Sequence, residues 1–198
     1  GNMNFPENLE SSKLPELSDF GFDEHEPADE RSVMKFYGGE TEALKRMQDY
    51  FWGTNAVQNY KQTRNGLLGS DYSSKFSAWI ALGSLSPREV YWEIKKYDQV
   101  HGSGDSSYSL YLELLWRDYF RFMFKKYGNK FFYKIGFKGV APEEGENQQE
   151  LFELWKNAET GIPFIDANMK ELNVTGFMSN RGRQNVASFL VKDLKVNW

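Results

Sequence analysis

Helical spacing of apolar residues runs through most of this 198-residue chain and constrains its fold more than any other feature. Beyond Gly38-Gly39, apolar side chains recur every three or four residues, as at Ala43, Met47 and Phe51. No run alternates apolar and polar residues between turn signals, and no internal repeat is found. The sequence therefore predicts an all-α fold.

Helix-start and helix-stop signals divide the chain into separate helices. Ser86-Pro87-Arg88-Glu89 is typical of a helix start, with serine as the cap, proline in the first turn and glutamate three residues after the cap. Thr41 is expected to cap an earlier helix. The longest helix is expected over 107–127, and because it is apolar nearly all round, we expect it to be buried. Further helices are expected over about 55–63, 86–101, 149–159 and 163–175 and from 179 onward, with an acidic loop at 138–148.

The first 33 residues lack helical periodicity, so we expect an acidic arm or linker over 1–33 and a helical domain over 34–198. Nine acidic residues stand against Lys13 and Arg31 in the first 31 positions, whereas the whole chain has a net charge of −4. The rest of the chain is therefore mildly basic. This balance is compatible with nucleic-acid binding but does not demand it.

Composition excludes several kinds of chemistry. The chain has no cysteine and only two histidines, His25 and His101. Disulfides, thiol nucleophiles and cysteine or multi-histidine metal sites are thus excluded, and we predict no metal site. The sequence shows no signal peptide and no apolar run long enough to span a membrane. We expect a cytoplasmic protein without a membrane partner.

Aromatic residues make up 17% of the chain, about twice what we expect of an average domain. A large aromatic core accounts for most of them. The same content suits a flat conjugated ligand, or bases that stack on aromatic faces.

One polar segment has the composition of an anion site. Tyr72-Ser73-Ser74-Lys75-Phe76-Ser77 brings three serine hydroxyls and an ammonium group to the expected start of a helix. Serine-rich helix caps are common, so this segment taken alone is more simply read as a cap.

Two further clusters lie on helix faces. Glu113, Trp116, Arg117 and Phe120 share one face of the long helix, where Glu113 and Arg117 could form a surface ion pair, an internal salt bridge or part of a ligand pocket. Near a later helix start, Asn180, Arg183 and Gln184 share a face. Their amide and guanidinium donors suit the edge of a base or of a flavin ring, although Asn180 alone could simply cap the helix.

Several segments resemble one family in the same order along the chain. They are Asn59-Tyr60-Lys61-Gln62-Thr63-Arg64-Asn65-Gly66, the segment 72–77, Leu115-Trp116-Arg117-Asp118-Tyr119-Phe120, the segments 156–163 and 166–172, and Phe177-Met178-Ser179-Asn180-Arg181-Gly182-Arg183-Gln184. Together they resemble the flavin-binding helical domain of the photolyase/cryptochrome superfamily, and most closely that of the DASH-type cryptochromes. The resemblance covers residues 32–198.

The resemblance implies FAD as the cofactor and assigns roles by position. The implied FAD-binding residues are Tyr60, Ser73, Ser74, Lys75, Phe76, Ser77, Leu110, Asn180 and Arg183. The implied DNA-binding residues are Glu113, Trp116, Arg117, Asn180, Arg181 and Gln184. Glu113 matches the carboxylate that hydrogen-bonds a pyrimidine dimer, Trp116 the indole that packs against it, and Trp198 the middle member of a tryptophan electron chain.

The activity implied by the resemblance is light-dependent repair of cyclobutane pyrimidine dimers, in single-stranded DNA, by electron transfer from photoexcited reduced FAD. This is the reaction of a deoxyribodipyrimidine photo-lyase. Two alternatives stay open: a blue-light signalling cryptochrome that binds FAD without repair, and a helical nucleic-acid-binding module without a cofactor. The presence of both Glu113 and Trp116 favours repair.

The sequence also departs from the family. The amino-terminal α/β antenna domain, where a folate-type pigment could bind, has no counterpart here, and the family continues beyond the position of Trp198. The flavin domain is therefore expected to be incomplete at its C-terminal end and to need the missing parts of its own full-length chain as partners. The loop 138–148 has no tryptophan where the surface member of the electron chain is expected. We expect this chain alone to bind FAD weakly and to be inactive.

Overall fold

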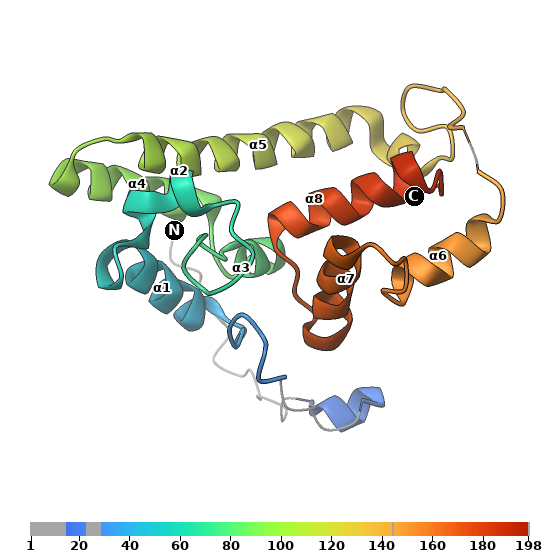
Figure 1. Cartoon of the computed structure of the whole chain (residues 1–198). Helices are drawn as coiled ribbons and strands as arrows, with labels where there is room; N and C mark the ends of the chain where they lie inside the picture. The colour runs from blue at the N-terminus through green and yellow to red at the C-terminus, as the bar shows by residue number, and fades with distance from the viewer. Residues whose placement is uncertain (1–14, 23–28, 144, 198) are drawn as a thin grey trace, which may run out of the picture.

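The computed structural model describes residues 15–22, 29–143 and 145–197. Within these ranges the chain is helical and forms no β-strand, which confirms the predicted all-α class (Figure 1). The α-helices are α1 (Glu40–Gln48), α2 (Tyr60–Thr63), α3 (Ser77–Leu82), α4 (Pro87–His101), α5 (Asp105–Tyr127), α6 (Gln148–Lys156), α7 (Pro163–Thr175) and α8 (Asn180–Ser188). Shorter 3₁₀ turns lie at Leu17–Phe20, Ala56–Asn59 and Gly128–Phe132, and π-helical turns follow α1 at Asp49–Gly53 and α8 at Phe189–Asp193.

The helices form two groups, each with its own apolar core. In the first group, α2 and α4 pack against α5, and the buried side chains of Tyr50, Phe51, Phe76 and Tyr97 form an aromatic cluster. Phe51 stacks on Phe76 with ring centroids 6.3 Å apart. This cluster is the aromatic core that the composition led us to expect.

The second group consists of α6, α7 and α8, with α7 packed against both of the others (Figure 1). Its core contains the buried side chains of Ile165, Met169, Met178 and Val186. The indole Nε1 of Trp155 on α6 donates a hydrogen bond of 3.0 Å to the carbonyl of Val186, which ties α6 to α8.

The starts of α4, α8 and α1 show how well capping residues in the sequence predict where a helix begins. Ser86 caps α4 as predicted, because its side chain accepts a hydrogen bond from the backbone N–H of Arg88. Ser179 caps α8 in the same way, through the N–H of Gly182 at 2.9 Å. The prediction that Thr41 caps the first helix is wrong: α1 begins at Glu40 behind Gly39, whose φ of 93° lies in a region that glycine adopts without a Cβ penalty.

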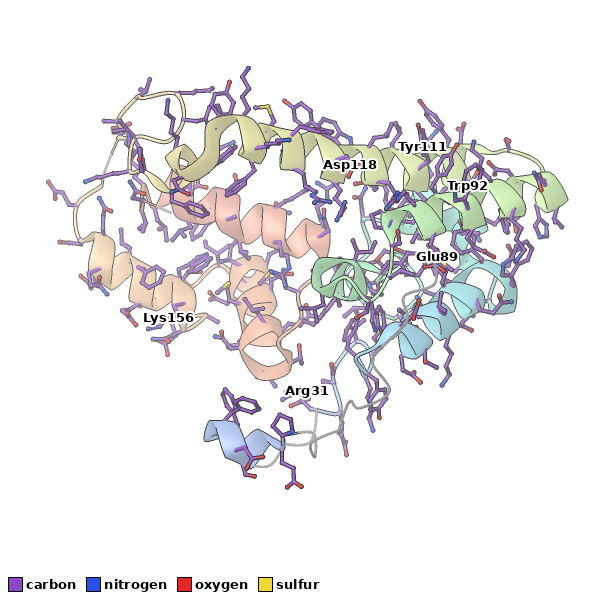
Figure 2. The ribbon with its side chains drawn as sticks, turned by 180° about the vertical axis from the view of Figure 1, so that it is seen from behind. Arg31, Glu89, Trp92, Tyr111, Asp118 and Lys156 are labelled. Atoms are coloured by element: carbon purple, nitrogen blue, oxygen red, sulfur yellow. The ribbon has the colours of Figure 1, made fainter. Side chains whose placement is uncertain are left out.

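The expectation that α5 is buried all round is wrong within the described residues. Its first half packs on the first core, where Leu110 is buried, but Trp116, Phe120 and Phe122 on its second half are 53%, 61% and 70% exposed. In the first half of α5, Tyr111 (labelled in Figure 2) contacts Tyr91 of α4, with ring centroids 5.7 Å apart. Helical periodicity identified the apolar positions of α5 without showing which of them have a partner.

Smaller differences concern helix ends and the acidic arm. The segment expected near 55–63 divides into the 3₁₀ turn and α2, α5 begins two residues earlier than expected, and α6 ends at Lys156 rather than near residue 159. Most of the arm lies outside the described residues, and its described part contains the 3₁₀ turn Leu17–Phe20.

The position of α8 depends on a glycine. A Cβ added to Gly182 would lie 2.1 Å from Oδ1 of Asn168 on α7, far inside van der Waals contact. Asn168 itself is buried, and its Nδ2 donates a hydrogen bond of 2.7 Å to the carbonyl of Phe164. The N-terminal end of α8 therefore lies so close to the Asn168 side chain that position 182 leaves no room for a Cβ.

Candidate functional site

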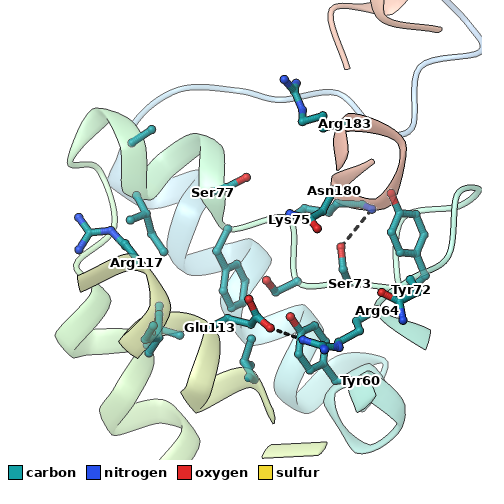
Figure 3. Close-up of a pocket in the computed structure, with 18 of the residues that line it drawn as sticks. Tyr60, Arg64, Tyr72, Ser73, Lys75, Ser77, Glu113, Arg117, Asn180 and Arg183 are labelled. Carbon is teal, nitrogen blue, oxygen red and sulfur yellow. Dashed lines mark hydrogen bonds and ion pairs between the residues drawn. The ribbon is translucent and has the colours of Figure 1, made fainter. Parts of the chain in front are cut away.

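A cavity of about 570 Å³ lies where the two helix groups meet, and all three of the polar segments found in the sequence contribute to it (Figure 3). Its lining comes from the end of α2, the loop before α3, α3 and α4, one face of α5 and the start of α8: Tyr60, Arg64, Asn65, Tyr72, Ser73, Ser74, Lys75, Phe76, Ser77, Ile80, Ala81, Val90, Leu110, Glu113, Leu114, Arg117, Phe177, Met178, Asn180 and Arg183.

Arg46 of α1 holds the loop 70–74 from the side opposite the cavity. This arginine is 8% exposed and does not line the cavity. Its Nε donates to the carbonyl of Ser74 at 3.1 Å, and its Nη2 donates to those of Ser70 and Ser73 at 3.0 and 3.4 Å. Its Nη1 pairs with Asp49 at 3.1 Å and with Asp71 at 3.0 Å. One guanidinium thus fixes three carbonyls of the loop.

Lys75 is buried, with 6% exposure, and has a left-handed φ of 63°. Its Nζ lies 3.0 Å from the centre of the Tyr72 ring and donates a hydrogen bond of 3.2 Å to the Ser73 hydroxyl (Figure 3). The pKa of Lys75 is lowered to about 7, first by burial and then by the positive charge of Arg46, while Glu171 and Asp71 act in the opposite direction. Burial also raises the pKa of Glu171.

Glu113 of α5 pairs with Arg64 at the end of α2 (Figure 3). The pair lies beside Tyr60, a buried residue whose pKa is raised to about 12, first by burial and then by the charge of Glu113. An ion pair between Glu113 and Arg117 was one of the open alternatives, and it does not form. Arg117 instead pairs with Asp118 at 3.0 Å. Both Glu113 and Arg117 line the cavity.

At the start of α8, Asn180 and Arg183 line the cavity, and Nε of Arg183 donates to the carbonyl of Met178 at 3.1 Å. Gln184 does not line it, although it was expected to share a face with them. The carbonyl of its side chain accepts a hydrogen bond of 2.9 Å from Arg181, and Arg181 donates to Asn65 at 2.7 Å. Arg181 and Gln184 therefore lie beside the cavity, on its exposed rim.

The remaining sequence-predicted residues are placed as follows. Tyr60, Leu110 and the whole segment 73–77 line the cavity. Trp116 does not line it but lies one turn along α5 from Glu113, with an exposed indole. Trp198 lies outside the described residues.

The lining fits the nucleotide part of FAD. Among the lining residues, four are basic (Arg64, Lys75, Arg117 and Arg183) and one is acidic (Glu113), a balance that suits a diphosphate. Among the described residues, none accepts a hydrogen bond from the backbone N–H of Ser74 or Lys75. Such free N–H groups beside hydroxyls are typical of phosphate sites. The volume is also in the range of small-molecule pockets, about 300–1,000 Å³.

Two residues of the site were missed in the sequence. Arg46 belongs to a helix without any binding motif, and its contacts reach residues 24–28 positions away. Arg64 was part of a quoted segment but received no role, because its partner Glu113 is 49 positions away. No local signal identifies either one, since both act through contacts between distant segments.

Two further observations concern other kinds of site. In the described part of the chain, no cluster of three or more histidine, aspartate or glutamate residues could hold a metal ion. None of the described helices has the length and apolar character needed to cross a membrane.

Comparison with known proteins gives the family. Residues 110–198 match the family described as the FAD binding domain of DNA photolyase. The chain has the fold of the FAD-binding helical domain of the photolyase/cryptochrome superfamily and belongs to that superfamily.

Within the superfamily, the chain is similar to DASH-type cryptochromes. It is 52% identical over 190 residues to the cryptochrome DASH of Gloeobacter violaceus, covering 96% of this chain and 38% of the relative. The crystal structure of a Synechocystis cryptochrome matches with a TM-score of 0.84 and 57% identity over 87% of this chain and 35% of that one. A class III photolyase from Agrobacterium tumefaciens matches with a TM-score of 0.67 and 29% identity, over 81% of this chain and 32% of that one. The chain therefore spans about a third of the length of these relatives.

Proposed function

We propose that this chain forms part of a light-dependent flavoprotein that binds FAD and repairs cyclobutane pyrimidine dimers, with single-stranded DNA as the preferred substrate. The observation that carries the proposal is the convergence of the loop 72–77, Glu113 of α5, and Asn180 with Arg183 of α8 on one cavity. The family match supports FAD as the cofactor. Residues 34–198 then supply one part of the flavin domain, residues 1–33 act as a linker, and a folate-type antenna binds outside this chain.

In this proposal, different parts of the cavity wall contact different parts of FAD. The serine hydroxyls and free N–H groups of the segment 73–77 receive the diphosphate, and Lys75 neutralises part of its charge. Tyr60 and Leu110 provide the apolar wall on the α2 and α5 side. The amide of Asn180 and the guanidinium of Arg183 supply donors to the polar edge of the isoalloxazine.

The lesion is received on the neighbouring part of α5. The Glu113 carboxylate accepts hydrogen bonds from the dimer, and the exposed indole of Trp116 provides a flat surface against which it packs. Arg117, Arg181 and Gln184, together with Asn180, contact the strand around it. A lesion must leave the base stack to reach such a site, which costs less at a damaged pair.

Reduced FAD held by these residues would supply the light-driven electron transfer that splits the cyclobutane ring, and would accept the electron back afterwards. The chain's own residues position the two reacting partners and stabilise charge between them. This division of roles explains why a site without cysteine or clustered histidine is sufficient for the reaction.

The experiment is a repair assay with the full-length protein to which this chain belongs. We expect blue light, but not darkness, to remove thymine dimers from an oligonucleotide in the presence of reduced protein, faster from single than from double strands. Glu113→Gln should slow repair several-fold. Glu150→Gln, an exposed carboxylate on α6, is the matched control and should repair at the wild-type rate.

The outcomes separate the alternatives. FAD retained without any loss of dimer would contradict repair and favour the signalling cryptochrome. Salt-dependent binding of undamaged strands by a protein that takes up no flavin would contradict the whole proposal and favour a cofactor-free nucleic-acid-binding module.

A further inference from the structure

We propose that Arg46 is a positioning residue for the loop 70–74. From the side of the loop opposite the cavity, it sets the orientation of the peptide groups that receive the FAD diphosphate. The proposal rests on the proposed function, because it assigns Arg46 a role toward bound FAD. Arg46 itself does not line the cavity, so it acts only through the loop.

The first step is the number of loop groups that Arg46 holds. Its guanidinium hydrogen-bonds the carbonyls of Ser70, Ser73 and Ser74 and also pairs with Asp71, so Arg46 contacts four of the five residues of the loop 70–74. The Ser70 hydroxyl donates to the same Asp71 oxygen at 3.0 Å. The Tyr72 carbonyl of the same loop accepts a hydrogen bond of 2.9 Å from the Thr63 hydroxyl, whereas the carbonyls of Ser73 and Ser74 are held by Arg46.

The second step is the geometry of the peptide unit. The described peptide bonds are all trans, so each carbonyl points opposite to the N–H of the following residue. Because the carbonyls of Ser73 and Ser74 point to Arg46, the N–H groups of Ser74 and Lys75 point away from it. Ser74 and Lys75 line the cavity whereas Arg46 does not, so these two N–H groups face the cavity.

The third step is the choice of arginine. The three carbonyls and two carboxylates lie in different directions, and a planar guanidinium with five N–H donors can satisfy them at once. A lysine at this position has the same charge but only three donors on one atom. Arg46→Lys therefore tests the geometry of the loop separately from its charge.

The burial of Arg46 adds an electrostatic contribution. Arg46 is 8% exposed, whereas the side chains of Asp49 and Asp71 are 48% and 42% exposed and are therefore better screened by water. The guanidinium thus places a fixed positive charge behind the peptide groups that face the phosphates, which favours an anion in front of them.

The test measures FAD affinity of the full-length apoprotein, the amide NMR chemical shifts of the loop and amide hydrogen exchange in the helices. We expect Arg46→Lys to weaken FAD binding by about tenfold or more and to change the amide chemical shifts of residues 73–76 while leaving exchange in α4 and α5 unchanged. A purely structural role would speed exchange throughout the first helix group. Lys45→Gln, the exposed neighbour on α1 that pairs with Glu42 at 3.7 Å, is the matched control and should bind FAD like the wild type.

A second variant keeps the test decisive if Arg46→Lys does not fold. Asp71→Asn removes one half-exposed partner of Arg46 and should weaken FAD binding by about two- to fivefold. If the folded Arg46→Lys protein, or Asp71→Asn in its place, binds FAD as tightly as the wild type, Arg46 is not the positioning residue. If the wild type itself takes up no FAD, the proposed function fails instead.

Discussion

Arg64 and Glu113 form an ion pair that ties the end of α2 to the middle of α5, and each of the two side chains is 39% exposed. The pair fixes the carboxylate that we assign to the lesion at the edge of the cavity, while leaving room for a second hydrogen-bond donor to reach it (Figure 3). Arg64 thereby connects the flavin side of the cavity to the DNA side.

Removing the Arg64 side chain is expected to weaken recognition of the pyrimidine dimer clearly while lowering the free energy of unfolding only slightly. Half-exposed ion pairs contribute less than about 1 kcal/mol, so Arg64→Gln should unfold in urea almost as the wild type does. Its preference for dimer-containing over undamaged oligonucleotides should fall several-fold, because Glu113 loses the group that orients it. Competition binding measures this preference. The double variant with Glu113→Gln should show no further loss, and fully additive losses would contradict the coupling.

The lowered pKa of Lys75 predicts that FAD binding depends on pH. With its pKa lowered to about 7 in the empty cavity, the amine is mostly neutral at pH 8, whereas a bound diphosphate favours the charged form and raises the pKa. FAD binding then takes up a proton, and FAD affinity should fall by up to about tenfold per pH unit above pH 7. The groups that face this amine are Arg46, Asp71, Glu171 and the ring of Tyr72, whose own pKa burial raises to about 12.

Titration of apoprotein with FAD between pH 6 and 9 checks this dependence. Lys75→Met keeps the length of the side chain and should abolish most of the slope, whereas Lys95→Met, an exposed lysine on α4, should retain it. In the absence of FAD, the lowered pKa makes the unfolded state bind more protons, so the free energy of unfolding should rise with pH between about 7 and 10. A flat affinity profile for the wild type would contradict the assignment.

Gly182 is expected to be intolerant of a side chain. Gly182→Ala places a methyl group 2.1 Å from Oδ1 of the buried Asn168, so α8 or the Asn168 side chain must shift and the free energy of unfolding should fall by about 2 kcal/mol. FAD affinity should fall as well, because Asn180 and Arg183 move with the helix. Urea unfolding measures the first effect. Adding Asn168→Ala removes the clashing atom and should restore part of the stability; an unchanged stability of Gly182→Ala alone would contradict the close approach.

Trp116 is expected to contribute to DNA binding without contributing much to folding. Its indole is 53% exposed and contacts mainly Tyr119 and Phe120 of the same helix. Trp116→Ala should weaken binding of a dimer-containing single strand by about five- to 150-fold, the loss expected for one base stacked on an aromatic ring. Trp116→Phe should keep most of the affinity. Equal affinities for all three proteins, measured by fluorescence anisotropy, would exclude Trp116 from the interface.

Much of the fold was predictable because its signals are local. The start of α4 at Ser86-Pro87 and that of α7 at Pro163 follow from residues next to each other in the sequence. The exposed aromatic side of α5 was not predictable, since periodicity identifies an apolar face but does not identify its partner. The roles of Arg46 and Arg64 were missed for the same reason: both depend on contacts between residues that are far apart in the chain.

The assignment of the cavity to FAD is tested most directly by a crystal structure of the full-length protein with FAD. We predict the diphosphate within hydrogen-bond distance of the backbone N–H groups of Ser74 and Lys75 and of the hydroxyls in the segment 73–77, with the isoalloxazine edge at Asn180 and Arg183. FAD bound at another place, or with its phosphates turned away from the segment 73–77, would contradict the account.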